Sequence, residues 1–288
     1  MYPREFEYAA PSTLDEALAL LHSNEMAKVM SGGMSLIPLM KLRLFSPELV
    51  VDIGRVPGLD QIEDRGDDIA IGALVRHAEV AHSPLIREHA AALASAAAWT
   101  GDRQVRNRGT TCGALAHADV AADQPAAALA LGATLVATST SGTREIASED
   151  FFVDALTSAL EPTEILTELR IPKKGPGSGS AYDKLGRRGG HTDYAVAGVA
   201  ARVTQSSGTI SDARIAVTGV GTKPSLAIGA MEALVGSDGS TEAIAAAAAR
   251  ATEGVTVIED LYGSEEYKAH LASVYTRRAV EQALAAAG

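Results

Sequence analysis

The stretch that decides the fold is "VMSGGMSLIPLMKLRL", residues 29–44. A short apolar strand runs into two adjacent glycines, Gly32 and Gly33, and an amphipathic segment follows at once. Glycine lets the backbone approach a ligand closely, and the free N–H groups of such a turn point at a bound anion. A strand-to-helix connection can also use two glycines simply to turn, so both interpretations are open here. The stretch matches neither a Walker loop nor the G-x-G-x-x-G pattern.

A second glycine-rich stretch favours the anion-binding interpretation. It is "RQVRNRGTTCGALAHADVAADQPAAALAL" at residues 103–131. It holds Gly109 and Gly113, and a helix is predicted to begin near Pro125, because proline is favoured in the first turn. Two such loops in one domain can hold two ends of one extended ligand. A pyrophosphate needs N–H and hydroxyl donors but no lysine, so such a ligand suits an acidic chain.

Hydrophobic periodicity and turn residues organise the rest of the chain. The helix at 11–24 is predicted to be capped by Ser12, and the helical stretch at 76–101 is broken at Pro84. A Pro/Gly/Ser-rich connector at 172–181 precedes a small α+β unit. Strands are predicted at 27–30, 49–53, 164–172, 180–187, 195–204 and 210–220, with strand pairs inside 58–74 and 134–146, and two last helices at 240–253 and 265–287.

Composition excludes several classes of protein. The 288 residues suggest two or three domains, and a formal charge of -11 argues against nucleic acid or anionic membranes as partners. No apolar run is long enough to span a bilayer, so no membrane insertion is expected. The single cysteine, Cys112, excludes an internal disulfide and a cysteine-rich iron–sulfur or zinc site. The first residues show no secretory signal, so we expect a cytoplasmic protein.

The two glycine loops resemble those of a known family. "SGGMSL" at 31–36 and "RNRGTTCGALAHADVAADQPA" at 106–126 are similar to the two FAD-binding loops of the medium, flavoprotein subunit of molybdenum hydroxylases. The branch is that of carbon monoxide and nicotine dehydrogenases. Its loops read roughly A-G-G-[HQ]-S-L-[IVL]-P and R-N-x-G-T-x-G-G-[SN]-x-A-x-A-[DG], with a downstream Asp-x-P. Further similar stretches follow in order over essentially the whole chain, at 6–21, 69–80, 164–172 and 181–203.

The resemblance implies an α+β protein with the PCMH-type FAD-binding fold. Two α/β subdomains, at 1–54 and 55–174, are followed by a C-terminal domain at 175–288 of small antiparallel sheet plus helices. In the family, FAD lies extended between these parts.

The resemblance also implies which residues bind FAD. The backbone of the first loop holds the pyrophosphate, and the second loop serves the phosphates and the ribityl chain. His117 and Asp123 match polar positions that contact FAD, and Leu166 matches an apolar residue that packs near the flavin. The implied set is Ser31, Gly32, Gly33, Met34, Ser35, Leu36, Thr110, Cys112, Gly113, His117, Asp123, Leu166, Lys184 and Tyr194.

Two members of this set belong to the flavin ring. Lys184 matches a lysine near the isoalloxazine, where it would stabilise negative charge on the reduced ring. Tyr194 matches a residue that covers one ring face and limits access of the electron acceptor. Ordinary structural alternatives exist as well. Asp123 could be only the cap of the helix at Pro125, and we expect it both to cap the helix and to contact FAD. Lys184 could be solvated on an edge strand, Tyr194 could be a half-buried strand residue, and His117 could be a surface histidine.

Three features depart from the family's pattern. Met34 stands where His or Gln is usual, and the segment 186–194 is slightly longer. Cys112 stands where glycine is frequent, so its side chain either crowds a close backbone approach or is tolerated as a small residue. Related flavoproteins attach FAD through Cys or His. This branch binds FAD non-covalently, so we expect no covalent bond.

The chain shows no pattern for chemistry on an organic substrate, neither a serine nucleophile elbow nor H-E-x-x-H. That absence suits a subunit whose cofactor carries electrons. By resemblance, a large molybdopterin subunit oxidises the substrate and a small subunit with two [2Fe-2S] clusters relays electrons. FAD in this chain passes them to an external acceptor, and a dimer of heterotrimers is expected. The substrate, whether carbon monoxide, an N-heterocycle or an aldehyde, is set by the large subunit.

Two alternatives differ from this interpretation. A stand-alone flavoprotein oxidoreductase is disfavoured by the small size of the C-terminal unit. A structural subunit that has lost FAD would be marked by Met34 and Cys112. The intact Gly32, Gly113 and Asp123 argue against that loss.

Overall fold

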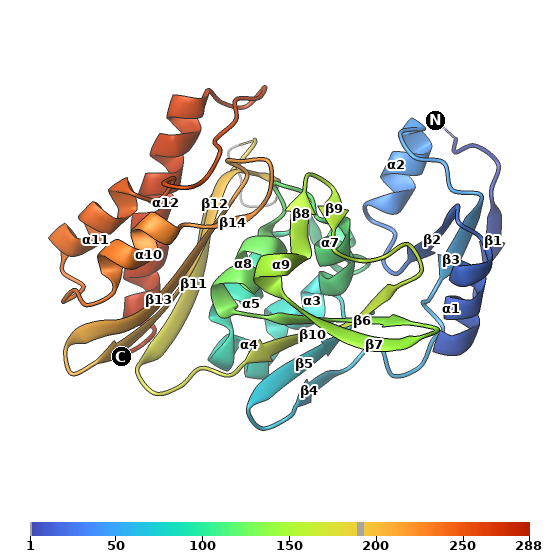
Figure 1. Cartoon of the computed structure of the whole chain (residues 1–288), viewed down its shortest axis with the longest axis horizontal. Helices are drawn as coiled ribbons and strands as arrows, with labels where there is room; N and C mark the ends of the chain where they lie inside the picture. Colours follow the sequence, from blue (N-terminus) through green and yellow to red (C-terminus); the bar gives the residue numbers. More distant parts are fainter. Residues whose placement is uncertain (1, 189–192) are drawn as a thin grey trace.

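The computed structural model describes residues 2–188 and 193–288, and every structural statement below concerns these residues. Three units lie in chain order across the molecule, with the N-terminal unit at one end and the C-terminal unit at the other (Figure 1). Within the described ranges they contain a three-stranded, a five-stranded and a four-stranded sheet, plus a two-stranded ribbon of β8 and β9.

The first unit is a small parallel sheet in the order β1-β3-β2. The chain leaves β2, passes through the two glycines into α2 and returns as β3, which lies between its partners. The predicted strands at 27–30 and 49–53 are confirmed, and the second is buried as expected. The first is not a buried strand, because only Ala27 of its four residues is buried. The elements are β1 (Glu7–Ala9), α1 (Leu14–Ser23), β2 (Ala27–Met30), α2 (Leu36–Leu42) and β3 (Leu49–Asp52).

The cap of α1 differs from the prediction. Thr13, not Ser12, is the N-cap, and its hydroxyl accepts a hydrogen bond from the backbone N–H of Glu16 at 3.2 Å. The backbone N–H and hydroxyl of Ser12 donate to the Glu16 carboxylate at 2.9 and 3.1 Å. Both hydroxyls precede the apolar periodicity, so sequence alone does not separate them. The Glu16 side chain determines which of the two is the cap, because its hydrogen bonds hold Ser12 one residue before Thr13.

The second unit is an antiparallel sheet in the order β4-β5-β10-β6-β7, with helices packed on one face. The predicted hairpin of β6 and β7 is confirmed, as is the break at Pro84, which begins α4. The elements are β4 (Ile62–Asp64), β5 (Asp68–Gly72), α3 (His77–His82), α4 (Pro84–His89), α5 (Ala91–Trp99), α6 (Arg103–Arg106), α7 (Thr111–His117), α8 (Asp123–Leu131), β6 (Thr134–Ser139), β7 (Gly142–Ala147), α9 (Ser148–Phe151), β8 (Phe152–Asp154), β9 (Thr157–Ser158) and β10 (Ile165–Pro172).

The third unit is an antiparallel sheet in the order β11-β12-β13-β14 that is covered on both faces. Helices α10, α11 and α12 pack on one face, and α5 and α8 of the second unit pack on the other. Every residue of α8 is buried, as expected for a helix between two layers. The elements are β11 (Ser178–Gly186), β12 (Ala195–Ser206), β13 (Thr209–Thr218), β14 (Ser225–Leu226), α10 (Ile228–Leu234), α11 (Thr241–Ala249) and α12 (Glu265–Ala285).

The connector predicted at 172–181 is wrong in its second half, because β11 already begins at Ser178. A Cβ on Gly179 would lie 2.1 Å from the carbonyl oxygen of Ala283 in α12. On the opposite face of the strand, the hydroxyl of Ser180 accepts a hydrogen bond from the backbone N–H of Ala92 in α5 at 3.2 Å. The small residues that suggest a linker therefore let two helices close on an edge strand.

Candidate cofactor site

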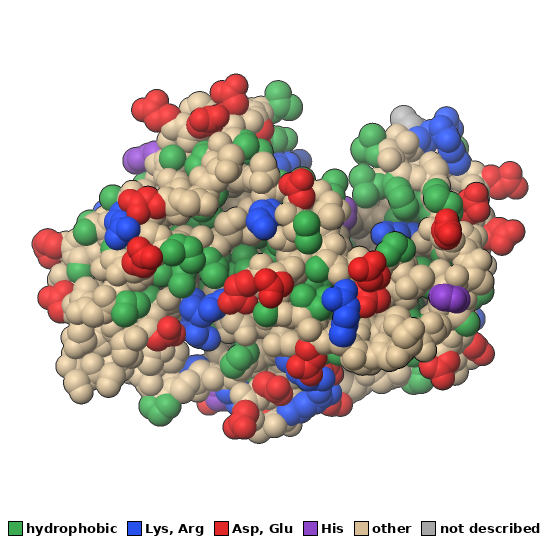
Figure 2. Space-filling model, viewed as in Figure 1, with side chains coloured by type: hydrophobic (Ala, Val, Ile, Leu, Met, Phe, Trp, Pro, Cys, Tyr) green, Lys and Arg blue, Asp and Glu red, His purple; other side chains and the backbone are tan. Residues whose placement is uncertain are grey.

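The structure brings the two glycine-rich loops together at the boundary of the first two units. Ser31 Oγ and Thr110 Oγ1 lie 2.9 Å apart and share a hydrogen bond. A Cβ on Gly32 would lie 2.2 Å from the carbonyl oxygen of Arg108, and one on Gly113 would lie 2.8 Å from Ser31 Oγ. These two glycines therefore allow the loops to touch. Figure 2 shows this side of the molecule hollowed beside α2, between the first unit and the rest.

The first loop presents a row of free backbone donors. Gly33 has a φ of +75°, which lets the chain turn sharply out of β2. Within the described ranges, the N–H groups of residues 32–35 have no protein acceptor, and the hydroxyl of Ser35 does not cap α2. The side chain of Met34 is exposed, so the departure from His or Gln leaves the backbone donors in place. Such a row of donors fits a pyrophosphate.

The second loop is closed by its own threonine. Thr110 is the N-cap of α7, and its hydroxyl accepts a hydrogen bond from the backbone N–H of Gly113 at 3.1 Å. Cys112 is buried and its thiol points at β5, donating to the carbonyl oxygen of Ile71 at 3.6 Å. Its side chain therefore does not stand between the two loops. Burial raises the pKa of this thiol to about 12, so it is not a ready nucleophile.

Three side chains beside the second loop were not predicted from the sequence. The backbone N–H of His77 donates to the carbonyl oxygen of Gly109 at 3.0 Å. Burial, with a contribution from Arg106, lowers the pKa of His77 to about 4, so the ring is neutral. The guanidinium of Arg76 donates to the carbonyl oxygen of Arg108. Burial lowers the pKa of Arg76. Arg76 and Arg106 both place positive charge beside the loop.

Asp123 and Lys184, from α8 and β11, form a buried ion pair between the second and third units. Lys184 Nζ lies 2.7 Å from each carboxylate oxygen, and the Tyr182 hydroxyl donates to the same carboxylate at 2.5 Å. Lys184 Nζ also donates to the carbonyl oxygens of Trp99, at 3.2 Å, and Asp193, at 2.6 Å. These acceptors match the three protons of an ammonium group. Burial raises the pKa of Asp123 to about 6, against the opposing effect of the Lys184 charge.

This ion pair corrects two of the structural alternatives. Asp123 does not cap α8, since Ala122 is the N-cap and the Asp123 carboxylate turns toward Tyr182 and Lys184 instead. Lys184 lies on an edge strand but is not solvated, because only 2% of it is exposed. The cause is the same in both cases: the third unit docks against α8 and closes over both charges.

A chain of buried hydrogen bonds joins the second loop to this ion pair. His77 Nδ1 lies 3.3 Å from Gln124 Nε2, which donates to Thr100 Oγ1 at 2.5 Å, and that hydroxyl lies 3.5 Å from Asp123 Oδ2. The amide of Gln124 thus serves two acceptors at once. The only sequence signals for this hydrogen-bond network are the position of Gln124 beside Asp123 and the position of His77 just after a strand.

The other implied residues lie at the margins of this network. Leu166 is buried in β10 within the main core, next to a bulge. His117 is the last residue of α7 and is half-buried, and burial lowers its pKa, so it is not an ordinary surface histidine. Tyr194 precedes β12 rather than lying in it, and 42% of it is exposed.

Two family models match this chain. Residues 4–174 match the FAD binding domain in molybdopterin dehydrogenase, and residues 180–283 match the CO dehydrogenase flavoprotein C-terminal domain. The chain belongs to the FAD-binding medium subunits of the molybdenum hydroxylase family. These matches confirm the predicted family, the α+β fold class and FAD as the cofactor of this oxidoreductase subunit. The roles of single residues toward FAD stay predictions.

Relatives of this medium subunit are similar over their full length. The 6-hydroxypseudooxynicotine dehydrogenase complex subunit alpha of Paenarthrobacter nicotinovorans is 41% identical over 99% of this chain and 96% of its own. The carbon monoxide dehydrogenase medium chain of Hydrogenophaga pseudoflava is 38% identical over 99% of each. The solved structure of carbon monoxide dehydrogenase from that organism, lacking the Mo-pyranopterin moiety of its cofactor, matches with a TM-score of 0.95 at 39% identity over 99% of both chains.

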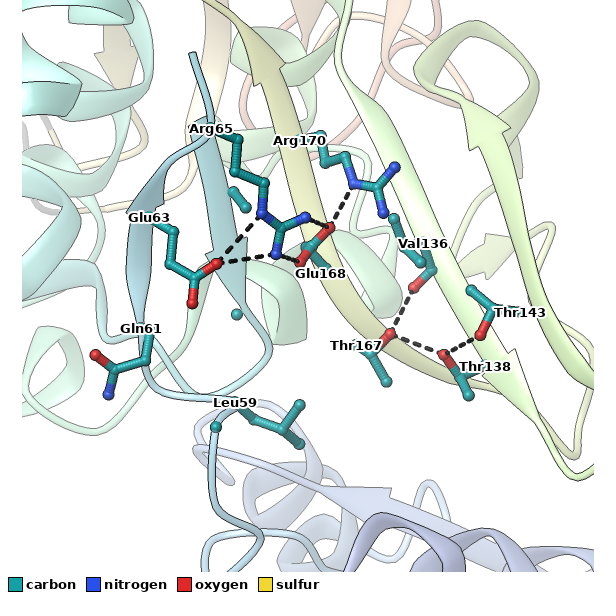
Figure 3. A pocket seen from close by; sticks show the side chains of 13 residues that line it. Leu59, Gln61, Glu63, Arg65, Val136, Thr138, Thr143, Thr167, Glu168 and Arg170 are labelled. Carbon is teal, nitrogen blue, oxygen red and sulfur yellow. Dashed lines mark hydrogen bonds and ion pairs between the residues drawn. The ribbon is translucent and has the colours of Figure 1, made fainter. Parts of the chain in front are cut away.

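A polar groove of about 270 Å³ lies on the five-stranded sheet of the medium subunit, outside the two loops. Figure 3 shows Arg65 between Glu63 and Glu168, at 3.0 and 2.7 Å, so the charges of the groove satisfy one another. The bulge in β10 turns Thr167 toward Thr138, whose hydroxyl lies 2.9 Å away. This is the pattern of a solvated sheet face. Among the described residues no acid, histidine or cysteine cluster suits a metal ion, and no helix is long and apolar enough to cross a bilayer.

Proposed function

We propose that this chain is the electron-transfer subunit of a molybdenum-containing dehydrogenase complex of the carbon monoxide or nicotine dehydrogenase type. Its partners are a large molybdopterin subunit and a small [2Fe-2S] subunit. When bound, FAD would take electrons from the clusters of the small subunit and deliver them to an external acceptor. The observation that carries this proposal is the contact of two glycine loops with free N–H groups at residues 32–35.

Each part of the site has a proposed task. The backbone of Ser31–Leu36 binds the pyrophosphate, and Thr110 and Gly113 hold the second loop against it. Lys184 stabilises negative charge on the reduced ring through its charge and not through a hydrogen bond, because Asp123 and two carbonyl oxygens already accept its three protons. Tyr194 covers one face of the ring.

The finer points belong to the same proposal. A dimer of heterotrimers and a location in the cytoplasm rest on the family resemblance alone. Relatives that are named as a complex subunit or a medium chain support assembly with partner chains. The division of the chain at residues 54 and 174 is supported by the separate sheets on either side. The large subunit sets the substrate. Relatives named for carbon monoxide and for 6-hydroxypseudooxynicotine support carbon monoxide and an N-heterocycle as substrate classes.

The absorption spectrum of the purified chain tests FAD binding. FAD added to the chain is expected to give flavin bands near about 370 and 450 nm that stay with the protein through gel filtration. Acid precipitation should release the colour into the supernatant, since Cys112 is buried away from the loops. Colour in the pellet would contradict non-covalent binding. Flavin missing both from the chain and from the complex with its partner subunits would contradict the proposed function.

A further inference from the structure

Beside Lys184, three side chains form a stack to which the FAD assignment gives no role. The guanidinium carbon of Arg187 lies 5.2 Å from the centre of the Tyr194 ring and 4.4 Å from that of the Tyr262 ring. Arg187 follows β11 and Tyr194 precedes β12, and the Arg187 N–H donates to the Tyr194 carbonyl oxygen at 2.9 Å. Tyr262 comes from the segment between α11 and α12. One cation thus contacts two rings from distant parts of the chain.

The Tyr262 side of this stack is firmly held. Lys268 in α12 is 1% exposed, and its Nζ lies 2.8 Å from Asp260 Oδ2 and 3.1 Å from the carbonyl oxygen of Gly219. The same Asp260 carboxylate accepts a hydrogen bond from the backbone N–H of Tyr262 at 2.8 Å. A buried lysine therefore fixes the turn from which the Tyr262 ring extends.

Within the described residues Arg187 makes no ion pair with a carboxylate, although the charges of Asp193 and Asp260 act on it from a greater distance. These two acids pair instead with Arg188, at 2.7 Å, and with Lys268. The Nε atom of Arg187 is buried and has no hydrogen-bond partner within residues 2–188 and 193–288. An arginine that leaves a donor unused while it contacts two rings is placed by those rings.

The Tyr194 side lacks a buried anchor of this kind, because Asp193 pairs with Arg188, whose side chain is 85% exposed. The Tyr194 ring is 42% exposed, close to the 43% of Tyr262, and its hydroxyl has no protein hydrogen-bond partner in the described parts of the chain. Its backbone N–H donates to its neighbour Asp193 at 2.8 Å, which fixes the main chain but not the ring. The contact with Arg187 therefore constrains where the Tyr194 ring lies, together with the burial that raises the pKa of its hydroxyl to about 12.

We propose that Arg187, held by Tyr262, is a positioning residue that sets where the Tyr194 ring lies and so which electron acceptors reach the flavin. This inference rests on the proposed function, in which Tyr194 covers one face of the ring. The stack then determines acceptor specificity: a bulky acceptor must displace Tyr194 and is slowed, whereas a small acceptor is not.

The test uses the FAD-loaded complex with Tyr262→Ala, Tyr262→Phe, and Arg278→Gln as a matched control. Arg278 also stacks on a tyrosine, Tyr275 at 5.0 Å, in the same domain. Reoxidation of the reduced flavin is followed with dichlorophenolindophenol as the bulky acceptor and ferricyanide as the small one. Tyr262→Ala is expected to raise the bulky-acceptor rate about two- to fivefold, the factor that one exposed cation–π contact is worth. Ferricyanide should react as before, and Tyr262→Phe and the control should match the wild type.

A second readout needs no flavin. In the full chain, nitration of Tyr194 by tetranitromethane, mapped by mass spectrometry, should speed up in Tyr262→Ala and stay unchanged in Tyr262→Phe and Arg278→Gln. An unchanged nitration rate in folded Tyr262→Ala overturns the positioning role. The positioning role is also overturned if Tyr262→Phe raises the nitration rate as much as Tyr262→Ala does, because the Phe variant keeps the ring.

Tyr194→Ala separates this inference from the proposed function. If it alters reoxidation and Tyr262→Ala does not, the positioning role is wrong while the role of Tyr194 at the flavin holds. If neither variant changes reoxidation, both of those roles are wrong. If the complex contains no flavin, the proposed function itself is wrong.

Discussion

His77 and Lys184 show two ways in which this chain buries an ionisable side chain. Lys184 is buried as one partner of an ion pair, and Asp123 and two carbonyl oxygens accept hydrogen bonds from its ammonium group. Among the described residues no carboxylate pairs with His77, and its Nδ1 accepts a hydrogen bond from the amide of Gln124, so it is buried in its neutral form. The first arrangement holds two units together, and the second makes the site sensitive to acid.

Stability is therefore expected to fall in acid through His77. Its pKa is lowered from 6.5 to about 4 in the folded chain. The unfolded chain takes up the proton below pH 6.5, whereas the folded chain does so only near pH 4. The stabilisation is complete above pH 6.5 and is lost as the pH falls through this window, by about 3 kcal/mol in all. Urea unfolding at a series of pH values should show this slope for the wild type and lose it in His77→Asn.

His270 provides the matched control for this experiment, because it is an exposed histidine. His270→Asn should keep the slope of the wild type. A wild-type slope in His77→Asn would show that other groups cause the loss of stability in acid.

At the scale of elements, sequence patterns predicted what depends on local periodicity. The strands at 27–30 and 164–172 and the long last helix recur in the structure within one or two residues. The short helices α7 and α10 were missed, since alanine and glycine give no clear period over seven residues. The start of β11 was missed because what a glycine means depends on the helix that packs against it.

The candidate site divides in the same way. The two loops could be located from their motifs, because the glycines stand together in the sequence. Tyr182, Gln124 and His77 could not be found, since their hydrogen bonds join residues 47 and 59 positions apart. The Tyr182 pair forms only when the third unit docks on α8, and the His77 pair forms only when the helices of the second unit pack together, so no local pattern encodes either contact.

The contact between the two loops leaves no room for a side chain at Gly32. Gly32→Ala would place a methyl group 2.2 Å from the Arg108 carbonyl oxygen, so the loops must separate. Overpacking of this kind costs about 1–3 kcal/mol, and the separation should weaken FAD binding as well. Gly175→Ala is the control, because nothing lies within 4 Å of a Cβ there. Thermal unfolding and FAD titration measure both effects, and equal FAD affinity in the two variants would contradict the assignment of the loops.

At the scale of the whole molecule, the second and third units share one core. Tyr182, Ala200 and Ala216 of the C-terminal sheet belong to the main apolar cluster of the FAD-binding part. Trp99, the single tryptophan, meets Tyr182 edge to face, with ring centres 6.0 Å apart. The docked surface is thus part of the interior, and the two units are not independent domains on a flexible linker.

The shared core predicts a single cooperative unfolding transition. Trp99 fluorescence reports the docked surface, and far-UV circular dichroism reports all helices and strands. The two signals should change together with urea, at one midpoint and with one slope. A fluorescence change that precedes the loss of ellipticity would show that the third unit undocks before the rest unfolds.

The placement of α12 has a consequence for synthesis on the ribosome. This last helix covers β11 and β12, yet about 80 residues separate the end of β12 from the end of α12, which takes roughly 4–16 s to translate. During that time the alanine- and valine-rich outer face of β12 has no helix to cover it. The nascent chain therefore exposes an apolar sheet surface until α12 has been synthesised and has packed on it.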